Sequence, residues 1–137
     1  MIFKFYDTLP QAAADIRKEV FVDEQGFKDE FDAVDAGAIH MLVFDADKPI
    51  ATCRFYPREG GGYLIGRIAV RREYRGKGIG AEMLRAAETH IHELGVGLAF
   101  IHAQVRAEGF YRKQGYTPFG GQDLDEGQPH IWMKKSL

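Results

Sequence analysis

Apolar and polar positions recur along this chain with two different spacings, and each spacing predicts one kind of element. Apolar runs with many β-branched and aromatic residues predict strands, whereas apolar residues three and four positions apart predict helices. The predicted strands cover residues 2–6, 39–44, 50–56, 63–70, 97–105, 116–119 and 131–134. The predicted helices extend from a cap at Thr8 to about Phe21, over 79–94 and over 107–114.

Turn and cap residues predict how these elements are joined. Thr8 has the chemistry of a helix cap, with Pro10 expected in the first turn of that helix. Over residues 23–35 the helical spacing weakens and acidic residues accumulate, which indicates a loop or a broken helix. Residues 120–129 are rich in glycine and acids, so we expect a loop between the last two strands.

The order of the elements predicts an α+β (mixed α/β) fold in a single domain spanning residues 1–137. The first strands follow one another through short turns and are expected to be antiparallel. The helix of 79–94 stops at Gly95, so the strand of 97–105 returns parallel to the strand of 63–70 in a right-handed crossover. We therefore expect one twisted mixed sheet with a central parallel pair and helices on both faces. Ligands in such sheets favour the carboxyl ends of the parallel strands.

Composition narrows the class of protein without identifying it. Hydrophobic residues make up 45% and charged residues 28% of the 137, so the chain is expected to fold on its own rather than to be disordered. The formal charge of −2 supplies no overall field for nucleic acid or for an anionic membrane, and neither is expected as a partner. No long apolar span or signal-like start is present. Cys53, the single cysteine, is interpreted as a buried small hydrophobe, and a cytoplasmic location is expected.

A basic, glycine-rich turn separates the strand of 63–70 from the helix that follows it. Gly76, Gly78 and Gly80 let successive backbone N–H groups point into one concavity, and the start of the helix adds its unpaired amides and dipole. Arg75 and Lys77 add full positive charges. A phosphate or pyrophosphate would suit this turn, although a glycine turn alone is equally compatible with simple chain reversal.

Two motifs in order resemble the GNAT superfamily of acetyl-CoA-dependent N-acetyltransferases. Residues 75–80, Arg-Gly-Lys-Gly-Ile-Gly, match the pyrophosphate motif Arg/Gln-x-x-Gly-x-Gly/Ala of that superfamily. Residues 104–116 are similar to its Asn-x-x-Ala-x-x-Phe-Tyr-x-x-x-Gly-Phe segment, with Gln104 in place of the usual Asn and Tyr116 in place of the usual Phe. Further stretches resemble the ElaA/YjcF-like branch and together span nearly the whole chain. They are residues 16–25, Asp35 with His40, 53–55, 66–70, 103–104 and 129–133.

The resemblance implies acetyl-CoA as cofactor, bound mainly by the backbone. The pyrophosphate would be held by the amides of 75–80, which include Ile79, and the pantetheine arm would pair with the strand at Ile68, Ala69 and Val70. In this fold the two central strands splay apart to admit the cofactor, and Gln104, at the end of the second one, is expected to be among the residues that bind it. The alternative for residues 68–70 is an ordinary core strand.

Direct acetyl transfer requires an acid for the departing thiolate and a base for the attacking amine. Tyr111 matches the general acid of the superfamily, and its alternative is a packing aromatic beside Phe110. Glu24 is the preferred base because it lies where this fold builds its acceptor site, although an acidic loop is often only solvated surface. Gln25 would orient the acceptor through hydrogen bonds.

Three more side chains are candidates for the acceptor site. His40 and His130 lie beside apolar residues on predicted strands, so each is either a base acting through water or a packed structural histidine. Arg54 lies in the middle of a predicted strand and would either bind an anionic acceptor group or form a structural ion pair. The histidines show no spacing of a metal site, and no metal is expected.

The sequence therefore predicts an acetyl-CoA-dependent N-acyltransferase that acts directly on a primary amine of a small molecule or peptide. Two alternatives stay open: a CoA-binding module without catalysis, and an enzyme like the acyl-homoserine-lactone synthases. Exposed final strands make a homodimer possible.

Overall fold

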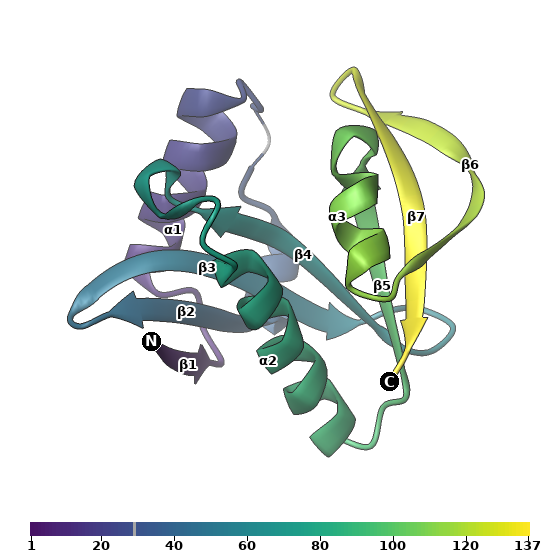
Figure 1. Ribbon diagram of the computed structural model, residues 1–137, viewed down its shortest axis with the longest axis horizontal. Helices are drawn as coiled ribbons and strands as arrows, with labels where there is room; N and C mark the ends of the chain where they lie inside the picture. Colours follow the sequence, from purple (N-terminus) through teal and green to yellow (C-terminus); the bar gives the residue numbers. More distant parts are fainter. Residues whose placement is uncertain (29) are drawn as a thin grey trace.

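The computed structural model describes residues 1–28 and 30–137, which form one mixed seven-stranded sheet flanked by helices (Figure 1). The strands are β1 (Ile2–Tyr6), β2 (Ile39–Asp45), β3 (Lys48–Pro57), β4 (Tyr63–Val70), β5 (Leu98–Gln104), β6 (Thr117–Asp125) and β7 (Gln128–Ser136). The α-helices are α1 (Gln11–Arg17), α2 (Ile79–Glu93) and α3 (Glu108–Lys113). The π-helix is η1 (Lys18–Glu24), and the 3₁₀ segments are η2 (Ala33–Gly37), η3 (Arg72–Tyr74) and η4 (Val105–Ala107). The spatial order is β1-β2-β3-β4-β5-β7-β6, with β4 and β5 as the parallel pair.

Helices cover both faces of the sheet, as the sequence predicted. Successive residues of β2 show this, because Met41 packs in the cluster that contains α2, whereas Leu42 packs in the cluster that contains α1. In Figure 1, α2 crosses in front of β3 and β4 while α1 lies behind them. Full burial of an aliphatic side chain such as Met83 or Ile91 stabilises the fold by roughly 1.5–3 kcal/mol, so these two clusters anchor the sheet.

The central parallel strands are joined at one end only. Their ladder consists of the pairs Tyr63↔Ala99 and Leu64↔Phe100. Beyond these pairs β4 and β5 diverge, as Figure 1 shows, so the described part of the sheet gives the rest of β4 no strand partner on that edge. The register between β3 and β4 also shifts near Arg67, whose φ of 51° is a left-handed conformation. This bulge bends β4 away from β5.

The first helix differs from its prediction at both ends. Its N-cap is Pro10 rather than Thr8, and no side chain caps it. The helix also continues past Phe21, because residues Lys18–Glu24 form a π-helix directly after α1. The backbone N–H of Phe27 bonds to the carbonyl of Phe21 at 2.9 Å and closes this segment. The wider turn carries the chain to Gln25.

The prediction of a loop over residues 120–129 was wrong. Strand β6 continues to Asp125 and β7 begins at Gln128, so a tight turn at Glu126 and Gly127 joins them. The register between the two strands shifts between Pro118 and Gln122. The glycines at 120 and 121 therefore mark a bulge inside a strand, which is a recognised position for glycine.

Candidate functional site

A cavity of about 420 Å³ lies where β4 and β5 separate. Ile65 and Ile68 of β4 line one side, and Ile101 and Ala103 of β5 line the other. Side chains from both faces of the sheet reach it, including Tyr111 from the α2 side. The cavity therefore connects the two faces through the opening between the strands.

The glycine turn lies at the end of β4 and opens directly into α2. Gly76 and Gly78 have φ values of 77° and 78°, which side chains rarely adopt, and Gly78 is the N-cap of α2. A Cβ atom at either glycine would meet nothing within 4 Å, so the space in front of the turn is open. No side chain caps α2. The turn therefore has free amides, a helix dipole and open space, which fit an anionic group such as a pyrophosphate.

Arg75 ties this turn to η1. Its Nη2 donates to Glu24 Oε1 at 2.9 Å, and its Nε donates to the carbonyl of Val70 at 2.9 Å. Arg72 approaches the same carboxylate at 3.6 Å. Glu24, the preferred base, thus lies beside the turn in an ion pair, and its side chain is not among those that line the cavity.

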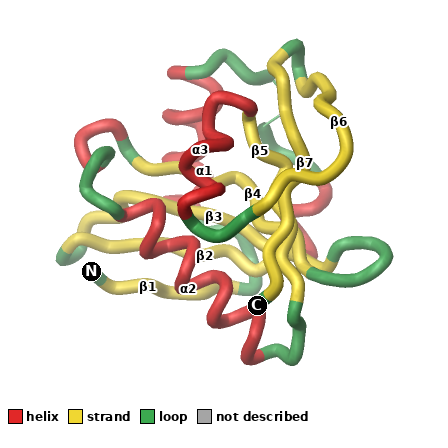
Figure 2. The backbone as a smooth tube through the Cα atoms, turned by 45° about the vertical axis from the view of Figure 1, so that its right-hand side comes forward, coloured by secondary structure: helices red, strands yellow, loops and turns green. Residues whose placement is uncertain are grey.

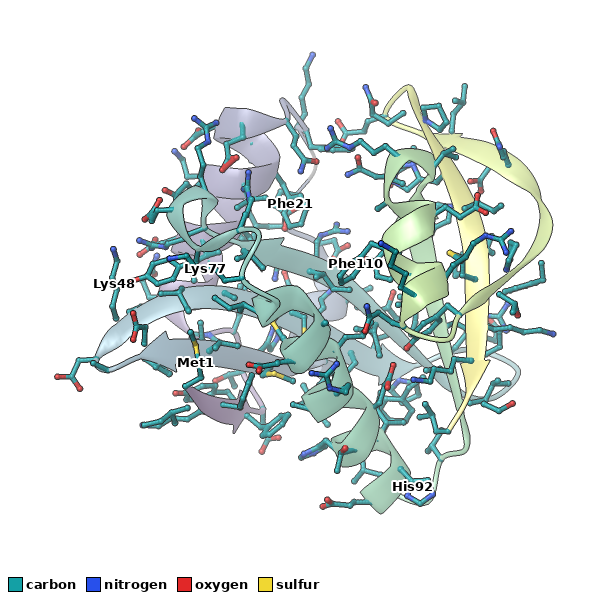
Figure 3. All side chains as sticks on the ribbon, in the orientation of Figure 1. Met1, Phe21, Lys48, Lys77, His92 and Phe110 are labelled. Carbon is teal, nitrogen blue, oxygen red and sulfur yellow. The ribbon has the colours of Figure 1, made fainter. Side chains whose placement is uncertain are left out.

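Tyr111 reaches the cavity from α3. Burial raises the pKa of its phenol well above the ordinary value of 10. The hydroxyl therefore stays protonated at neutral pH and can act as a hydrogen-bond donor. Phe110, the preceding residue, approaches the position of a Cβ at Gly80 within 3.5 Å, so α3 packs directly against the start of α2. In Figure 3, Phe110 extends from α3 toward α2, and Lys77 lies on the turn before α2. Helix α3 therefore places Tyr111 at the cavity and Phe110 against the start of the helix that follows the glycine turn.

The residues expected along the cofactor path are brought together. Ile68 lines the cavity, whereas Ala69 is buried against α1 and Val70 packs on the α2 side, next to Gly80. Ile79 is buried as the first residue of α2. The side chains of residues 68–70 thus pack on both faces of the sheet, while the edge of β4 that faces β5 has no strand partner here among the described residues.

Two glutamines bridge the opening between the strands. Gln104 Nε2, at the end of β5, donates to Gln25 Oε1, just after η1, at 2.9 Å. A second bridge follows, in which the backbone N–H of Lys28 donates to Glu126 Oε1 at 2.9 Å. Figure 2 shows this segment after η1 reaching the β6–β7 turn at the top of the molecule. The two predicted residues Gln25 and Gln104 therefore lie together at the edge of the cavity.

Arg54 lines the cavity but is also held in an ion pair. Its Nη1 donates to Asp32 at 2.7 Å and to Asp35 at 2.8 Å, and the side chain is buried. Its Nε is buried and has no hydrogen-bond partner among the described residues. His40 is buried, bonds through Nε2 to the carbonyl of Asp35, and does not line the cavity. The ion-pair alternative for Arg54 is present, and its Nε is the guanidinium nitrogen that has no partner among residues 1–28 and 30–137.

His130 lies at the cavity beside His102, a histidine that the sequence did not single out as a site residue. The Nδ1 of His130 contacts the carbonyl of Gln128 at 2.8 Å. His102, on β5, also lines the cavity, and its Nε2 lies 2.7 Å from Asp123 Oδ1. Its ring stacks on Trp132 at 4.5 Å and lies 4.8 Å from the ring of His130. This pair was missed because Asp123 fell within the predicted loop, and only the true β6–β7 register brings it opposite His130.

With this geometry in place, comparison with known proteins decides the family. Residues 7–137 match the description "Acetyltransferase (GNAT) domain". The chain belongs to the GNAT acetyltransferase family. YjcF of Bacillus subtilis, an uncharacterized N-acetyltransferase, is 34% identical to this GNAT protein over 123 residues, which are 88% of this chain and 87% of YjcF.

Solved structures agree. A Lactobacillus plantarum protein named provisionally as an N-acetyltransferase has a TM-score of 0.92 and 32% identity, covering 99% of this chain and 97% of that one. Escherichia coli ElaA shares the fold, with a TM-score of 0.83 and 24% identity over 98% of this chain and 99% of ElaA. The predicted fold and the resemblance to the ElaA/YjcF-like branch are confirmed.

Three further features of this GNAT protein concern a metal site, a membrane-spanning helix and the single cysteine. Within residues 1–28 and 30–137, no three His, Cys, Asp or Glu side chains gather as a metal site requires. No helix in the described ranges is long and apolar enough to cross a membrane. Cys53 is buried and free, and burial raises its pKa to about 12, which confirms its interpretation as a small core residue.

Proposed function

We propose that this protein transfers the acetyl group of acetyl-CoA directly to a primary amine. One observation carries the proposal: the open edge of β4 joins the glycine turn to a cavity that Tyr111 lines. A protein of the same fold, with a TM-score of 0.76, is an aminoglycoside 6′-N-acetyltransferase solved in complex with coenzyme A. Acetyl-CoA supplies the activated acyl group, and the residues described above bind and orient it.

The donor half of the site binds through backbone groups. The amides of residues 76–80 and the charges of Arg75 and Lys77 receive the pyrophosphate, and the unpaired edge of β4 around Ile68 receives the pantetheine amides as an added strand would. Because Arg75 already pairs with Glu24, an anion at the turn shares that guanidinium with the carboxylate. The role of Glu24 that fits this position is to orient Arg75.

The chemistry at the thioester is a proton transfer on each side of it. Tyr111, buried and protonated, donates to the departing sulfur. Gln25 and Gln104 lie at the edge of the cavity with amide groups able to orient an acceptor, and Arg54 offers one unpaired Nε–H. The acceptor reaches the thioester from the cavity face that carries His130 and Trp132.

Calorimetric titration with acetyl-CoA tests the donor half. Gly78→Glu places a negative charge at the turn and is expected to weaken binding by more than about tenfold, or ~1.4 kcal/mol. Gly95→Glu is the matched control, since Gly95 has a similar φ of 85°, equally open surroundings, and lies beyond the other end of α2. Millimolar binding by the wild-type protein, or equal losses in both variants, would overturn the assignment of the turn.

Release of free thiol with a panel of primary amines tests the transfer. Turnover is expected with at least one amine, and Tyr111→Phe should lower kcat with little change in acetyl-CoA affinity. Tight binding without thiol release from any amine supports a CoA-binding module instead. Lactone formation from S-adenosylmethionine and an acyl donor would support the synthase-like alternative.

A further inference from the structure

We propose that His102 is the general base of this acetyltransferase and that Asp123 positions its imidazole. The inference rests on the proposed function and adds to it the residue that removes the proton from the attacking amine. Glu24, His40 and His130 were the candidates that the sequence suggested. In the structure Glu24 pairs with Arg75, His40 bonds to the carbonyl of Asp35, and His130 contacts the carbonyl of Gln128.

The hydrogen bond to Asp123 assigns the protonation of the ring. An ionised carboxylate only accepts hydrogen bonds, so the 2.7 Å contact makes Nε2 of His102 the donor. The other ring nitrogen, Nδ1, is left with its lone pair and bonds to no group in the described ranges. Stacking on Trp132 holds the plane of the ring. The residue is thus fixed in one tautomer by one neighbour and in one orientation by another.

The surroundings of His102 distinguish it from the other candidates. It lines the cavity and its side chain is 22% exposed, so an amine reaches it. His130 is 5% exposed and uses Nδ1 on the carbonyl of Gln128. The titratable groups that face His102 are Asp123 from β6 and His130 from β7, and the uncharged amide of Gln104 lies two residues further along β5.

Acid and base lie on opposite faces of the sheet. Ile101 and Ala103 of β5 pack in the α2 cluster with Tyr111, so His102 between them points to the other face. The cavity connects these faces between β4 and β5. This arrangement suits direct transfer, because the nucleophile enters on one side of the thioester and the sulfur leaves on the other.

The transfer balances with these two residues. The protonated amine gives one proton to Nδ1 of His102, and its nitrogen then forms a bond to the acyl carbon. The carbon–sulfur bond breaks, its electron pair goes to sulfur, and sulfur takes the proton of the Tyr111 hydroxyl. The products are an amide and a free thiol. The nitrogen loses its second proton through water to the Tyr111 phenolate, and solvent then takes the proton from His102.

Two nucleophiles separate a base from a structural residue. An alkylamine such as 2-phenylethylamine is protonated at neutral pH and needs a base, whereas hydroxylamine is uncharged there and does not. His102→Gln keeps a donor for Asp123 and is expected to lower kcat with 2-phenylethylamine by about 10²–10⁴-fold, while hydroxylamine loses less than about tenfold. Acetyl-CoA affinity, measured by calorimetry, should be unchanged.

Two further variants complete the test. Asp123→Asn, at a side chain that is 51% exposed, should show a smaller loss with the same selectivity, and it tests the pair even where His102→Gln fails to fold. His92→Gln is the matched control, since His92 lies exposed at the far end of α2 (Figure 3) and should leave both rates unchanged.

Equal losses with both nucleophiles, or full activity of His102→Gln with 2-phenylethylamine, would overturn the role of His102 and leave the transferase assignment intact. Wild-type protein that acetylates hydroxylamine but no alkylamine would also overturn it. Wild-type protein that binds acetyl-CoA but releases no thiol with any nucleophile overturns both proposals.

Discussion

Replacing Asp35 by Asn should destabilise the protein strongly at neutral pH and weakly in acid. Asp35 accepts hydrogen bonds from Arg17 at 2.8 Å and from Arg54 at 2.8 Å, and its side chain is 12% exposed. Burial alone would raise the pKa of Asp35, but these two guanidinium groups lower that pKa from 3.8 to about 2. Such a shift corresponds to about 2.5 kcal/mol of stability at pH 7.

The sign of the pH dependence follows from the depressed pKa. The contribution of Asp35 is complete above the unfolded-state pKa of 3.8 and is lost as the pH falls toward about 2. The Asn variant lacks this contribution at every pH, so the difference in unfolding free energy should shrink between pH 5 and pH 2. Asp32, whose pKa is lowered by its hydrogen bond to Arg54, and Glu30, whose pKa is raised by burial, are present in both proteins.

Urea unfolding followed by the fluorescence of Trp132, the single tryptophan, measures this difference across the pH series. Asp47→Asn, in the exposed β2–β3 turn, is the matched control and should stay within about 0.5 kcal/mol of wild type. A loss below about 0.5 kcal/mol for Asp35→Asn at pH 7, or a difference that stays constant between pH 5 and pH 2, would refute the argument.

Three other outcomes are expected. Tyr116→Phe should lower the free energy of unfolding, measured in urea, by about 1–3 kcal/mol. The reason is that buried Glu88, which accepts a hydrogen bond from the Tyr116 hydroxyl at 2.8 Å, loses that bond. An unchanged urea midpoint would contradict this. Cys53 should resist iodoacetamide at pH 8 in the native protein and react in urea, as followed by mass spectrometry, because burial raises its pKa to about 12. Gln104→Ala removes the bond to Gln25 and should raise the KM for the amine more than that for acetyl-CoA in steady-state assays.

The elements of the proposed donor half were predictable because their signals are local. The strand of 63–70, the glycine turn and the helix of 79–94 lie consecutively in the chain, and each shows a strong spacing or a strong turn residue. The structure has β4 over the predicted residues and ends α2 one residue earlier, at Glu93. Local chemistry therefore predicts the turn and its neighbours without knowledge of distant contacts.

The acceptor half was less predictable because it depends on strand register. His102 and Asp123 come together only because β7 pairs with β5 on one edge and with β6 on the other. The bulge between Pro118 and Gln122 changes which residues of β6 face the cavity. A slip of one residue turns every side chain to the opposite face, and neither the bulge nor the register has a signal in the spacing of apolar residues.

The stretch of residues 24–28, at the end of η1 and just after it, explains why the sequence could not order the candidate bases. Its residues are acidic, amide and basic in quick succession, which reads as solvated surface. In the structure, three of them reach three different parts of the site: Glu24 contacts Arg75 of the turn, Gln25 contacts Gln104 of β5, and Lys28 contacts the β6–β7 turn. The carboxylate of Glu24 thus contacts the proposed donor site, while the amide of Gln25 contacts the proposed acceptor site. The π-helix sets that division, since a helix ending at Phe21 would not carry the chain to these contacts.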